Sequence, residues 1–181
     1  TLALVGESGC GKTVTSLSLI RLLADTARVQ ADYMEVDGQK ILELTKDEAR
    51  KLRGSKISMI FQDSGAMMNP TRKVGDVFVE YLRTHEKISK KDAWAKGCGM
   101  LEKMNLPSPD NVMKSYPFQL SGGMRQRVII ALATFMSPNV VLADEPTTAL
   151  DVVVQKGILK MLMRLQKQLK NTMVIVSHDM G

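Results

Sequence analysis

The sequence predicts an α/β fold with a mainly parallel sheet flanked by helices, an inserted helical subdomain and a small antiparallel hairpin. Short apolar runs alternate with longer segments of helical periodicity at the spacing of parallel-sheet units. A methionine-rich helical stretch runs from about Val74 to Met136, and the turn pair Asp37-Gly38 separates two short extended segments. With 181 residues, 44% hydrophobic and 24% charged, the chain has the size and composition of one folded domain.

The first elements along the chain are a buried strand, a loop and a helix. The apolar run Leu2–Val5 ends at a glycine-rich turn, and residues 12 to about 24 have the periodicity of a helix. Residues 33–36 and 40–42 are expected to form the two arms of the hairpin. The apolar segment Ile57–Phe61 predicts a further strand.

The second half of the chain returns to the alternation after the helical stretch. We expect a strand at Val140–Ala143, a helix at Val152–Leu169 with one apolar face, and a strand at Met173–Val176. The whole chain is expected to be one partial domain, in which residues 1–73 and 137–181 form the core and residues 74–136 form the inserted helical subdomain.

Composition excludes several classes of protein. The longest apolar run, Val128–Ala133, is far shorter than the roughly 18 to 20 residues that cross a bilayer, and no signal peptide is expected. The two cysteines, Cys10 and Cys98, are too few for a disulfide scaffold and lack the spacing of metal ligands, which fits a reducing cytosol. A net charge of +6 indicates either an anionic partner or solvated helix faces, and we favour the latter.

The first glycine-rich turn matches the phosphate-loop pattern. Its glycines allow backbone N–H groups to curl around phosphate oxygens at a helix N-terminus, whose dipole favours anions. We expect Lys12 to reach the β and γ phosphates of a nucleotide, and Thr13 to offer its hydroxyl to Mg²⁺. A plain glycine-rich turn is the alternative, which the flanking strand and helix disfavour. The predicted binding residues are Gly6, Glu7, Ser8, Gly9, Cys10, Gly11, Lys12 and Thr13.

Two acidic residues follow the apolar strand at 140–143. Ligands gather at the carboxyl ends of strands in open α/β sheets, so Asp144 is expected to hold Mg²⁺ directly or through water. Glu145 is then placed to orient and deprotonate an attacking water. Taken alone, an acidic pair after a strand is equally well a solvated turn.

A second exposed helix N-terminus is expected at Ser121-Gly122-Gly123. Serine is a favoured helix cap, and the apolar segment after residue 127 continues the helix. By itself this pattern is more often a simple cap, and its presence beside a phosphate loop favours a second anion site.

Together, these motifs resemble those of the ATP-binding cassette (ABC) ATPases. The phosphate loop, Gln62 after a strand, LSGGMRQR, LADEP, the segment Thr148–Asp151 and Ser177-His178-Asp179 occur in the family's order. The residues of the segments GESGCGKT and ADEPTTALD are similar to those of the oligopeptide, dipeptide and nickel import branch of this family. The resemblance covers nearly the whole chain and implies the ABC type of phosphate-loop NTPase, with a RecA-like core.

The resemblance implies a role for each matching residue, with ATP and Mg²⁺ as cofactors. Gln62 would contact Mg²⁺ or the attacking water, Glu145 would be the general base, and His178 would contact the γ-phosphate. The metal ligands would be Thr13, Gln62 and Asp144. ATP bound to the opposite subunit would be contacted by Ser121, Gly122 and Gly123, with Asp151 at the same seam.

The resemblance also implies an ATPase that energises a membrane importer, most directly of oligopeptides or dipeptides. Its partners would be a second ABC ATPase subunit in a head-to-tail homodimer or heterodimer, transmembrane permease subunits and, indirectly, a solute-binding protein. We expect a peripheral location at the cytoplasmic face of the cell membrane and no nucleic acid. The alternatives are an exporter or lipoprotein-release ATPase, and a soluble ABC ATPase of DNA maintenance or translation. A phosphate-loop kinase or GTPase gives no reason for LSGGMRQR.

The sequence departs from the family pattern at a few places. Ser64 stands where the family usually has proline, and Thr148 stands where it commonly has serine. The N-terminal strands that bring an aromatic residue to adenine are absent, as is the C-terminal extension of the branch. We therefore expect a fragment that binds nucleotide weakly and hydrolyses it poorly alone.

Overall fold

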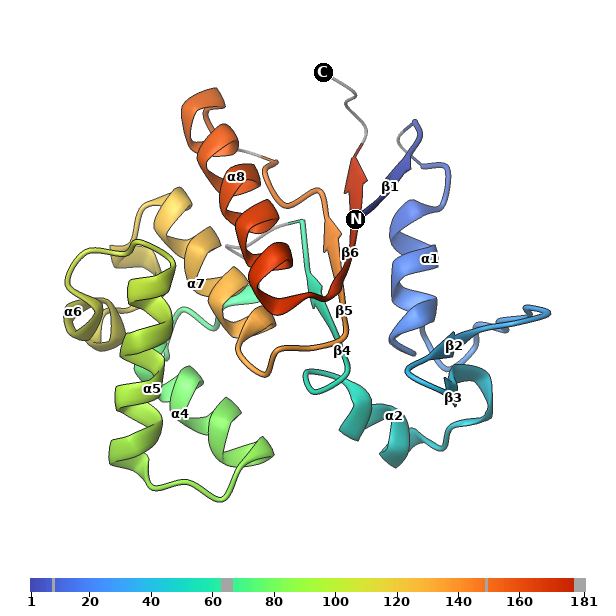
Figure 1. The fold of residues 1–181 in the computed structure, drawn as a ribbon, viewed down its shortest axis with the longest axis horizontal. Helices are drawn as coiled ribbons and strands as arrows, with labels where there is room; N and C mark the ends of the chain where they lie inside the picture. The colour runs from blue at the N-terminus through green and yellow to red at the C-terminus, as the bar shows by residue number, and fades with distance from the viewer. Residues whose placement is uncertain (8, 63–66, 149, 178–181) are drawn as a thin grey trace. The chain divides into compact units, whose positions relative to one another are not determined.

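The computed structural model describes residues 1–7, 9–62, 67–148 and 150–177, drawn in Figure 1. The chain divides into two compact units. The first unit comprises Thr1–Gln62, Met136–Pro146 and Met163–Gly181, and the second comprises Asp63–Phe135 and Thr147–Leu162. The predicted limits of the helical subdomain, 74–136, stay a prediction.

A parallel sheet of four strands is the centre of the first unit. The strands β1 (Leu2–Val5), β4 (Ile57–Ile60), β5 (Val140–Asp144) and β6 (Thr172–Ser177) lie in the order β1-β6-β5-β4. The register pairs Val5 with Ser177, Ala143 with Ile60, and Asp144 with Val176. All four strands therefore end at one edge, as the arrowheads in Figure 1 show.

Helix α1 (Lys12–Leu19) follows β1 through the glycine-rich loop and lies beside the sheet in Figure 1. The antiparallel hairpin of β2 (Glu35–Val36) and β3 (Gln39–Lys40), the 3-10 helix η1 (Ile41–Glu43) and helix α2 (Lys46–Leu52) come next. These elements share a buried apolar cluster with the sheet, which stabilises the unit by removing apolar surface from water. The cluster consists of Ile20, Val36, Ile41, Leu52, Ile57 and Leu142.

Several elements of the first unit are shorter than the sequence predicts, namely α1, both hairpin arms (observed at Glu35–Val36 and Gln39–Lys40) and β4, which ends one residue early. Helix α1 ends at Leu19 because Arg21 has a positive φ of 55°, which interrupts the helix. The Ile20 carbonyl at this helix end accepts a hydrogen bond from the Arg53 guanidinium at 3.1 Å. The second hairpin arm stops at Lys40 because the next carbonyls face Arg21, which donates to the Ile41 oxygen at 3.0 Å.

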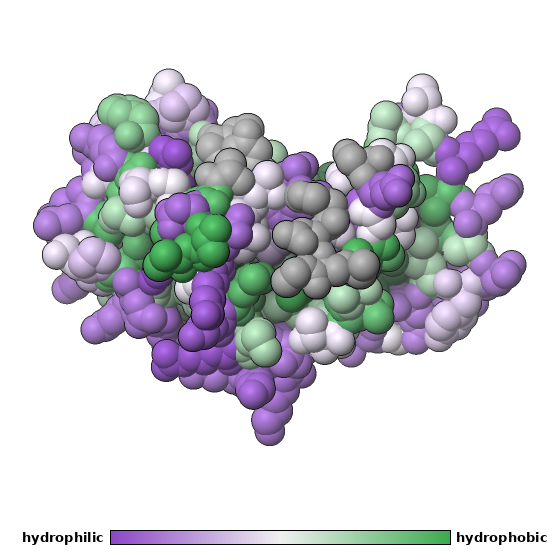
Figure 2. Space-filling model, turned by 90° about the horizontal axis from the view of Figure 1, so that it is seen from above, coloured by the Kyte–Doolittle hydropathy of each residue, from purple (hydrophilic) through white to green (hydrophobic). Residues whose placement is uncertain are grey.

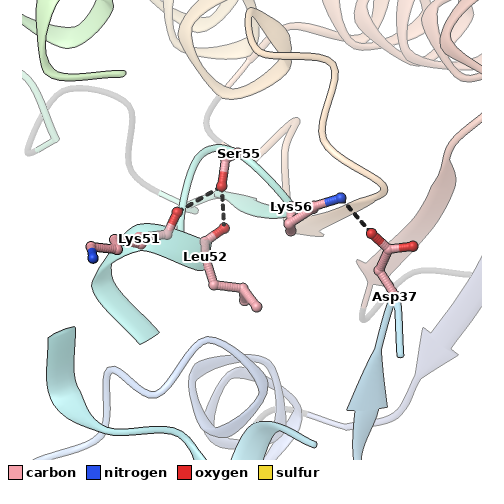
Figure 3. A network of polar contacts seen from close by, with 5 residues as sticks. All are labelled: Asp37, Lys51, Leu52, Ser55 and Lys56. Carbon is pink, nitrogen blue, oxygen red and sulfur yellow. Dashed lines mark hydrogen bonds and ion pairs between the residues drawn. The ribbon is translucent and has the colours of Figure 1, made fainter. Parts of the chain in front are cut away.

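Polar contacts fasten the segment between α2 and β4, as Figure 3 shows. The Ser55 hydroxyl donates to the Lys51 carbonyl at 2.6 Å, which satisfies one of the orphan carbonyls at the helix end. Lys56 forms an ion pair with Asp37, the first residue of the hairpin turn, whose φ of 52° suits a two-residue turn completed by Gly38. The hairpin turn is thus tied to the entrance of β4.

The second unit consists mainly of helices. They are α4 (Val74–His85), α5 (Lys90–Lys103), α6 (Pro109–Lys114), the 3-10 helix η2 (Pro117–Gln119), α7 (Gly122–Thr134) and the beginning of α8 (Val152–Leu169). Their apolar faces are buried against one another, and Phe78 meets Phe135 edge to face at 6.3 Å between ring centroids. The largest fully buried side chains of this unit include Leu82, Leu101, Met104, Met113 and Ile130.

Close approach of α4 to α5 depends on a glycine. A Cβ atom at Gly75 would lie 2.3 Å from the ring of Trp94 and 2.8 Å from the carbonyl oxygen of Met113. By contrast, a Cβ atom at Gly99, in the interior of α5, would meet nothing within 4 Å. Only the first glycine is therefore required by packing.

The predicted fold class is confirmed, since a parallel sheet flanked by helices and a small antiparallel hairpin are both present. In the ranges that the structure describes, no helix is long and apolar enough to cross a membrane. Several large apolar side chains nevertheless reach the surface, among them Tyr33, Phe118, Val152 and Val153. Figure 2 shows one face of the molecule, on which hydrophobic residues lie among hydrophilic ones.

Candidate functional site

The glycine-rich loop joins β1 to α1 at the edge of the sheet where the strands end. Gly9 and Gly11 have φ values of 81° and 95°, a region that suits glycine because other residues are strained there. Gly11 is the residue that precedes the first turn of α1, so the loop leads directly into a helix N-terminus. A Cβ atom at Gly6 would lie 2.7 Å from the Cys10 Sγ, so a larger residue there would require the Cys10 side chain to move.

Lys12 is buried within this loop. Its ammonium donates to the carbonyl oxygens of Gly6 and Glu7, both at 2.8 Å, and lies 3.7 Å from the Cys10 Sγ. Only 9% of the residue is exposed, so its positive charge lies inside the curve of the loop. Thr13, in the first turn of α1, is exposed to solvent.

Asp144 ends β5 at the same edge of the sheet. It is 2% exposed, and its Oδ1 atom is buried without a hydrogen-bond partner among the described residues. An unpartnered carboxylate oxygen in such a position is costly unless a cation or a donor completes its surroundings. Asp144 is therefore placed to bind a ligand at the end of the strand.

Glu145 follows directly and has an unusual backbone. Its φ of 44° is in the left-handed region, and its N–H donates to the carbonyl of Val176 in β6 at 3.0 Å. The Gln62 side chain, two residues beyond β4, donates from Nε2 to the Glu145 Oε2 at 2.8 Å. The ends of β4, β5 and β6 thus hold one carboxylate in a fixed direction.

In the first unit, the structure brings together most of the residues that the sequence predicts for this site. The loop of residues 6–13, Gln62, Asp144 and Glu145 all follow the carboxyl ends of paired parallel strands. Ser8 and His178 lie outside the described residues.

The other predicted residues belong to the second unit. The Ser121 hydroxyl accepts a hydrogen bond from the Met124 N–H at 3.3 Å and so caps α7, whose first turn has no acidic residue. A Cβ atom at Gly123 would lie 2.9 Å from the Val154 Cγ1, so glycine is needed where α7 approaches α8. Asp151 caps α8 by accepting from the Val154 N–H at 3.0 Å.

A cavity of about 570 Å³ lies beside Ser121 in the second unit. Sequence reasoning missed some of the residues that line it, namely Asn105, Leu106, Pro107 and Arg127. Among these lining residues, Arg127 donates from its guanidinium to the Met104 carbonyl at 2.9 Å. The signal available in the sequence was Pro107, a residue that interrupts the helical pattern of residues 74–136.

A loop of this conformation at the end of a parallel strand, with an acidic pair at the end of a neighbouring strand, defines the phosphate-loop class of nucleotide-binding proteins. The family model described as "ABC transporter" matches residues 1–148. The chain belongs to the ABC transporter family, and the resemblance found in the sequence is confirmed.

Several relatives of this chain are named as ATP-binding proteins of dipeptide or oligopeptide transport. It is 44% identical over 182 residues to the dipeptide transport ATP-binding protein DppD of Bacillus subtilis (strain 168), covering 100% of this chain and 54% of that protein. It is 42% identical over 182 residues to the oligopeptide transport ATP-binding protein OppD of the same strain, covering 100% of this chain and 51% of that one. The chain thus spans about half the length of the curated relatives it matches.

A solved structure with the same fold is the dimeric ATP-binding cassette MJ0796 in a post-hydrolysis state bound to ADP and Pi. The TM-score is 0.80 at 28% sequence identity, and the match covers 98% of this chain and 74% of that one.

Proposed function

We propose that this chain is the ATP-hydrolysing nucleotide-binding part of a membrane importer of dipeptides or oligopeptides. The observation that carries the proposal is the convergence of Lys12, Asp144 and the bonded pair Gln62–Glu145 at one edge of the parallel sheet. That set contains a phosphate-binding cation, a candidate metal ligand and a candidate base, which are the parts that phosphoryl transfer to water requires.

The glycine-rich loop is proposed to bind the triphosphate. Its backbone N–H groups and the N-terminus of α1 attract anionic oxygens, and the Lys12 ammonium adds a full positive charge. A bound phosphate would replace the carbonyl oxygens of Gly6 and Glu7 as acceptors for that ammonium. The remaining loop residues, Ser8, Gly9, Cys10 and Gly11, are proposed to contact the phosphates through the backbone.

The residues fit a Mg²⁺ ion. Asp144 offers a buried, unpartnered carboxylate oxygen, which is the hard ligand that Mg²⁺ prefers, and Thr13 and Gln62 would add oxygen atoms. Among the described residues there is no group of three or more His, Cys, Asp or Glu side chains that could hold a metal by itself. This agrees with Mg²⁺ sites, in which substrate phosphates and waters complete the shell. When bound, the ion would neutralise charge that develops on the phosphate oxygens.

Glu145 is the proposed general base. Its carboxylate takes a proton from a water that attacks the γ-phosphorus, the bond from that phosphorus to the β-bridging oxygen breaks, and ADP and phosphate are the products. The hydrogen bond from Gln62 holds the carboxylate in one orientation, and the bond from the Glu145 N–H to Val176 fixes its backbone. His178 is proposed to contact the γ-phosphate.

A second ABC ATPase subunit is proposed to complete the site. Ser121, Gly122 and Gly123 form a capped helix N-terminus without a carboxylate in its first turn, which suits the triphosphate held by an opposing subunit. Asp151, at the start of α8, would lie at the same seam. One such dimer would enclose two ATP molecules, one at each pair of half-sites.

Peptide import is favoured over the other ABC functions by the relatives, which are named for dipeptide and oligopeptide transport. The proposed partners are therefore transmembrane permease subunits, with a solute-binding protein acting through them. The proposed location is peripheral, at the cytoplasmic face of the cell membrane.

The proposal is tested by reconstituting the protein in vesicles with the permease subunits of a dipeptide importer. ATP hydrolysis and uptake of a labelled dipeptide should both require the Lys12 ammonium, so Lys12→Ala should abolish both. Hydrolysis without dipeptide uptake in the wild-type assembly would contradict peptide import, and the absence of ATP binding would contradict the nucleotide site itself.

A further inference from the structure

An aromatic pair stands immediately before the capped start of α7. The rings of Tyr116 and Phe118 are stacked, with 5.5 Å between their centroids and 9° between their planes. Phe118 is nevertheless 67% exposed, although it is one of the largest apolar side chains in the unit. Tyr116 therefore covers one face of the Phe118 ring, and much of the ring remains open to solvent.

The backbone around this pair is held in place. Pro117 is buried and begins η2, and the Tyr116 N–H donates to the Gln119 Oε1 at 2.8 Å. The Lys73 ammonium lies 5.7 Å from the centroid of the Tyr116 ring, within the range of a cation–π contact. The pair is thus a preorganised flat surface with a positive charge beside it.

The distance from this surface to the anion site is short. Ser121 is the third residue after Phe118, so their Cα atoms are at most about 11 Å apart. A single exposed phenylalanine is common and by itself assigns no role. A stacked aromatic surface within about 11 Å of a helix N-terminus fits a ligand that joins a planar ring to a chain of phosphates.

We propose that Phe118 stacks on the base of the nucleotide whose triphosphate is held by the phosphate loop of a second copy of this chain. The inference rests on the proposed function and extends it, because it assigns a residue to recognition of the base. Stacking on an aromatic ring tolerates every base, since each has a π face. Phe118 therefore contributes affinity for nucleotides without selecting adenine over guanine.

The test uses Glu145→Gln protein, in which hydrolysis is slowed, and measures the ATP concentration that gives half-maximal dimerisation by light scattering. Phe118→Leu removes the ring and retains apolar bulk, and Phe118→Tyr keeps a ring. We expect the leucine variant to need about 5- to 150-fold more ATP, which is the usual effect of losing one stacked base, and the tyrosine variant to match the parent. Tyr33→Leu, which removes an exposed aromatic from the hairpin region, is the matched control and should have no effect.

Inorganic tripolyphosphate with Mg²⁺ is the second probe, because it has no base. Its binding, measured by calorimetry, should be the same in the parent and in Phe118→Leu. Equal ATP dependence in these two proteins, or equal weakening of ATP and tripolyphosphate by Phe118→Leu, overturns the stacking role and leaves nucleotide binding intact. If the parent itself neither binds ATP nor dimerises with it, the proposed function fails, and the assignment of Phe118 fails with it.

Discussion

Replacing Glu145 by glutamine separates catalysis from binding, because the change keeps the shape of the side chain. In the structure, Gln62 donates to the Glu145 Oε2 at 2.8 Å, and a glutamine at 145 can turn its amide so that its oxygen accepts the same bond. That bond changes from charge-assisted to neutral and weakens by about 1 kcal/mol. Removal of the base raises the barrier much further, since general-base catalysis contributes about 10²- to 10⁴-fold, or about 3 to 5 kcal/mol.

The assay for this change is phosphate release at saturating ATP, together with the binding of a fluorescent ATP analogue. We expect hydrolysis to fall by about 10²- to 10⁴-fold while nucleotide binding survives. Glu43→Gln is the matched control, since it makes the same chemical change at an exposed carboxylate that pairs with Lys40 at the surface. A Glu145→Gln protein that hydrolyses ATP at the wild-type rate would refute the assignment of the base.

Three further predictions concern binding, thiol reactivity and packing. Lys12→Ala should weaken ATP binding at least about tenfold, since a charge-assisted hydrogen bond is worth about 1.5 to 3 kcal/mol, and unchanged binding in an equilibrium titration would contradict the phosphate assignment. Cys10 is exposed, whereas partial burial raises the pKa of the Cys98 thiol, so a maleimide followed by peptide mapping should label Cys10 first and ATP should slow only that reaction. Gly75→Ala should destabilise the protein by about 1 to 3 kcal/mol in urea unfolding, whereas Gly99→Ala should stabilise it by about 0.5 to 1 kcal/mol; equal effects would show that the contact at Gly75 does not limit packing.

Local patterns predicted most of the fold because they depend on neighbouring residues. The apolar run at Val140–Ala143 and the periodicity of Val152–Leu169 gave β5 and α8 nearly to the residue. The limits of α1 and of the hairpin arms were less well predicted. They depend on long-range contacts, in which Arg21 and Arg53 bind carbonyls more than 19 residues away in sequence.

The candidate site shows the same division between local and long-range information. The phosphate loop and the acidic pair were predictable, since each is a continuous motif whose flanking strand and helix can be recognised. The hydrogen bond between Gln62 and Glu145 was not, because it spans 83 residues and depends on the pairing of β4 with β5. The Tyr116–Phe118 stack was missed because residues two apart are not expected to face one another in regular helix.

The positive φ of Glu145 means that the proposed general base occupies a backbone conformation that lowers the stability of the fold. A bulky residue in that region of the Ramachandran map costs on the order of 1 to 3 kcal/mol, which glycine would largely avoid. Directed evolution that selects for thermal stability alone should therefore replace this glutamate with glycine or asparagine. The selected variants should unfold at a higher temperature and have lost ATPase activity. Retaining the carboxylate under such a regime requires that turnover be selected as well.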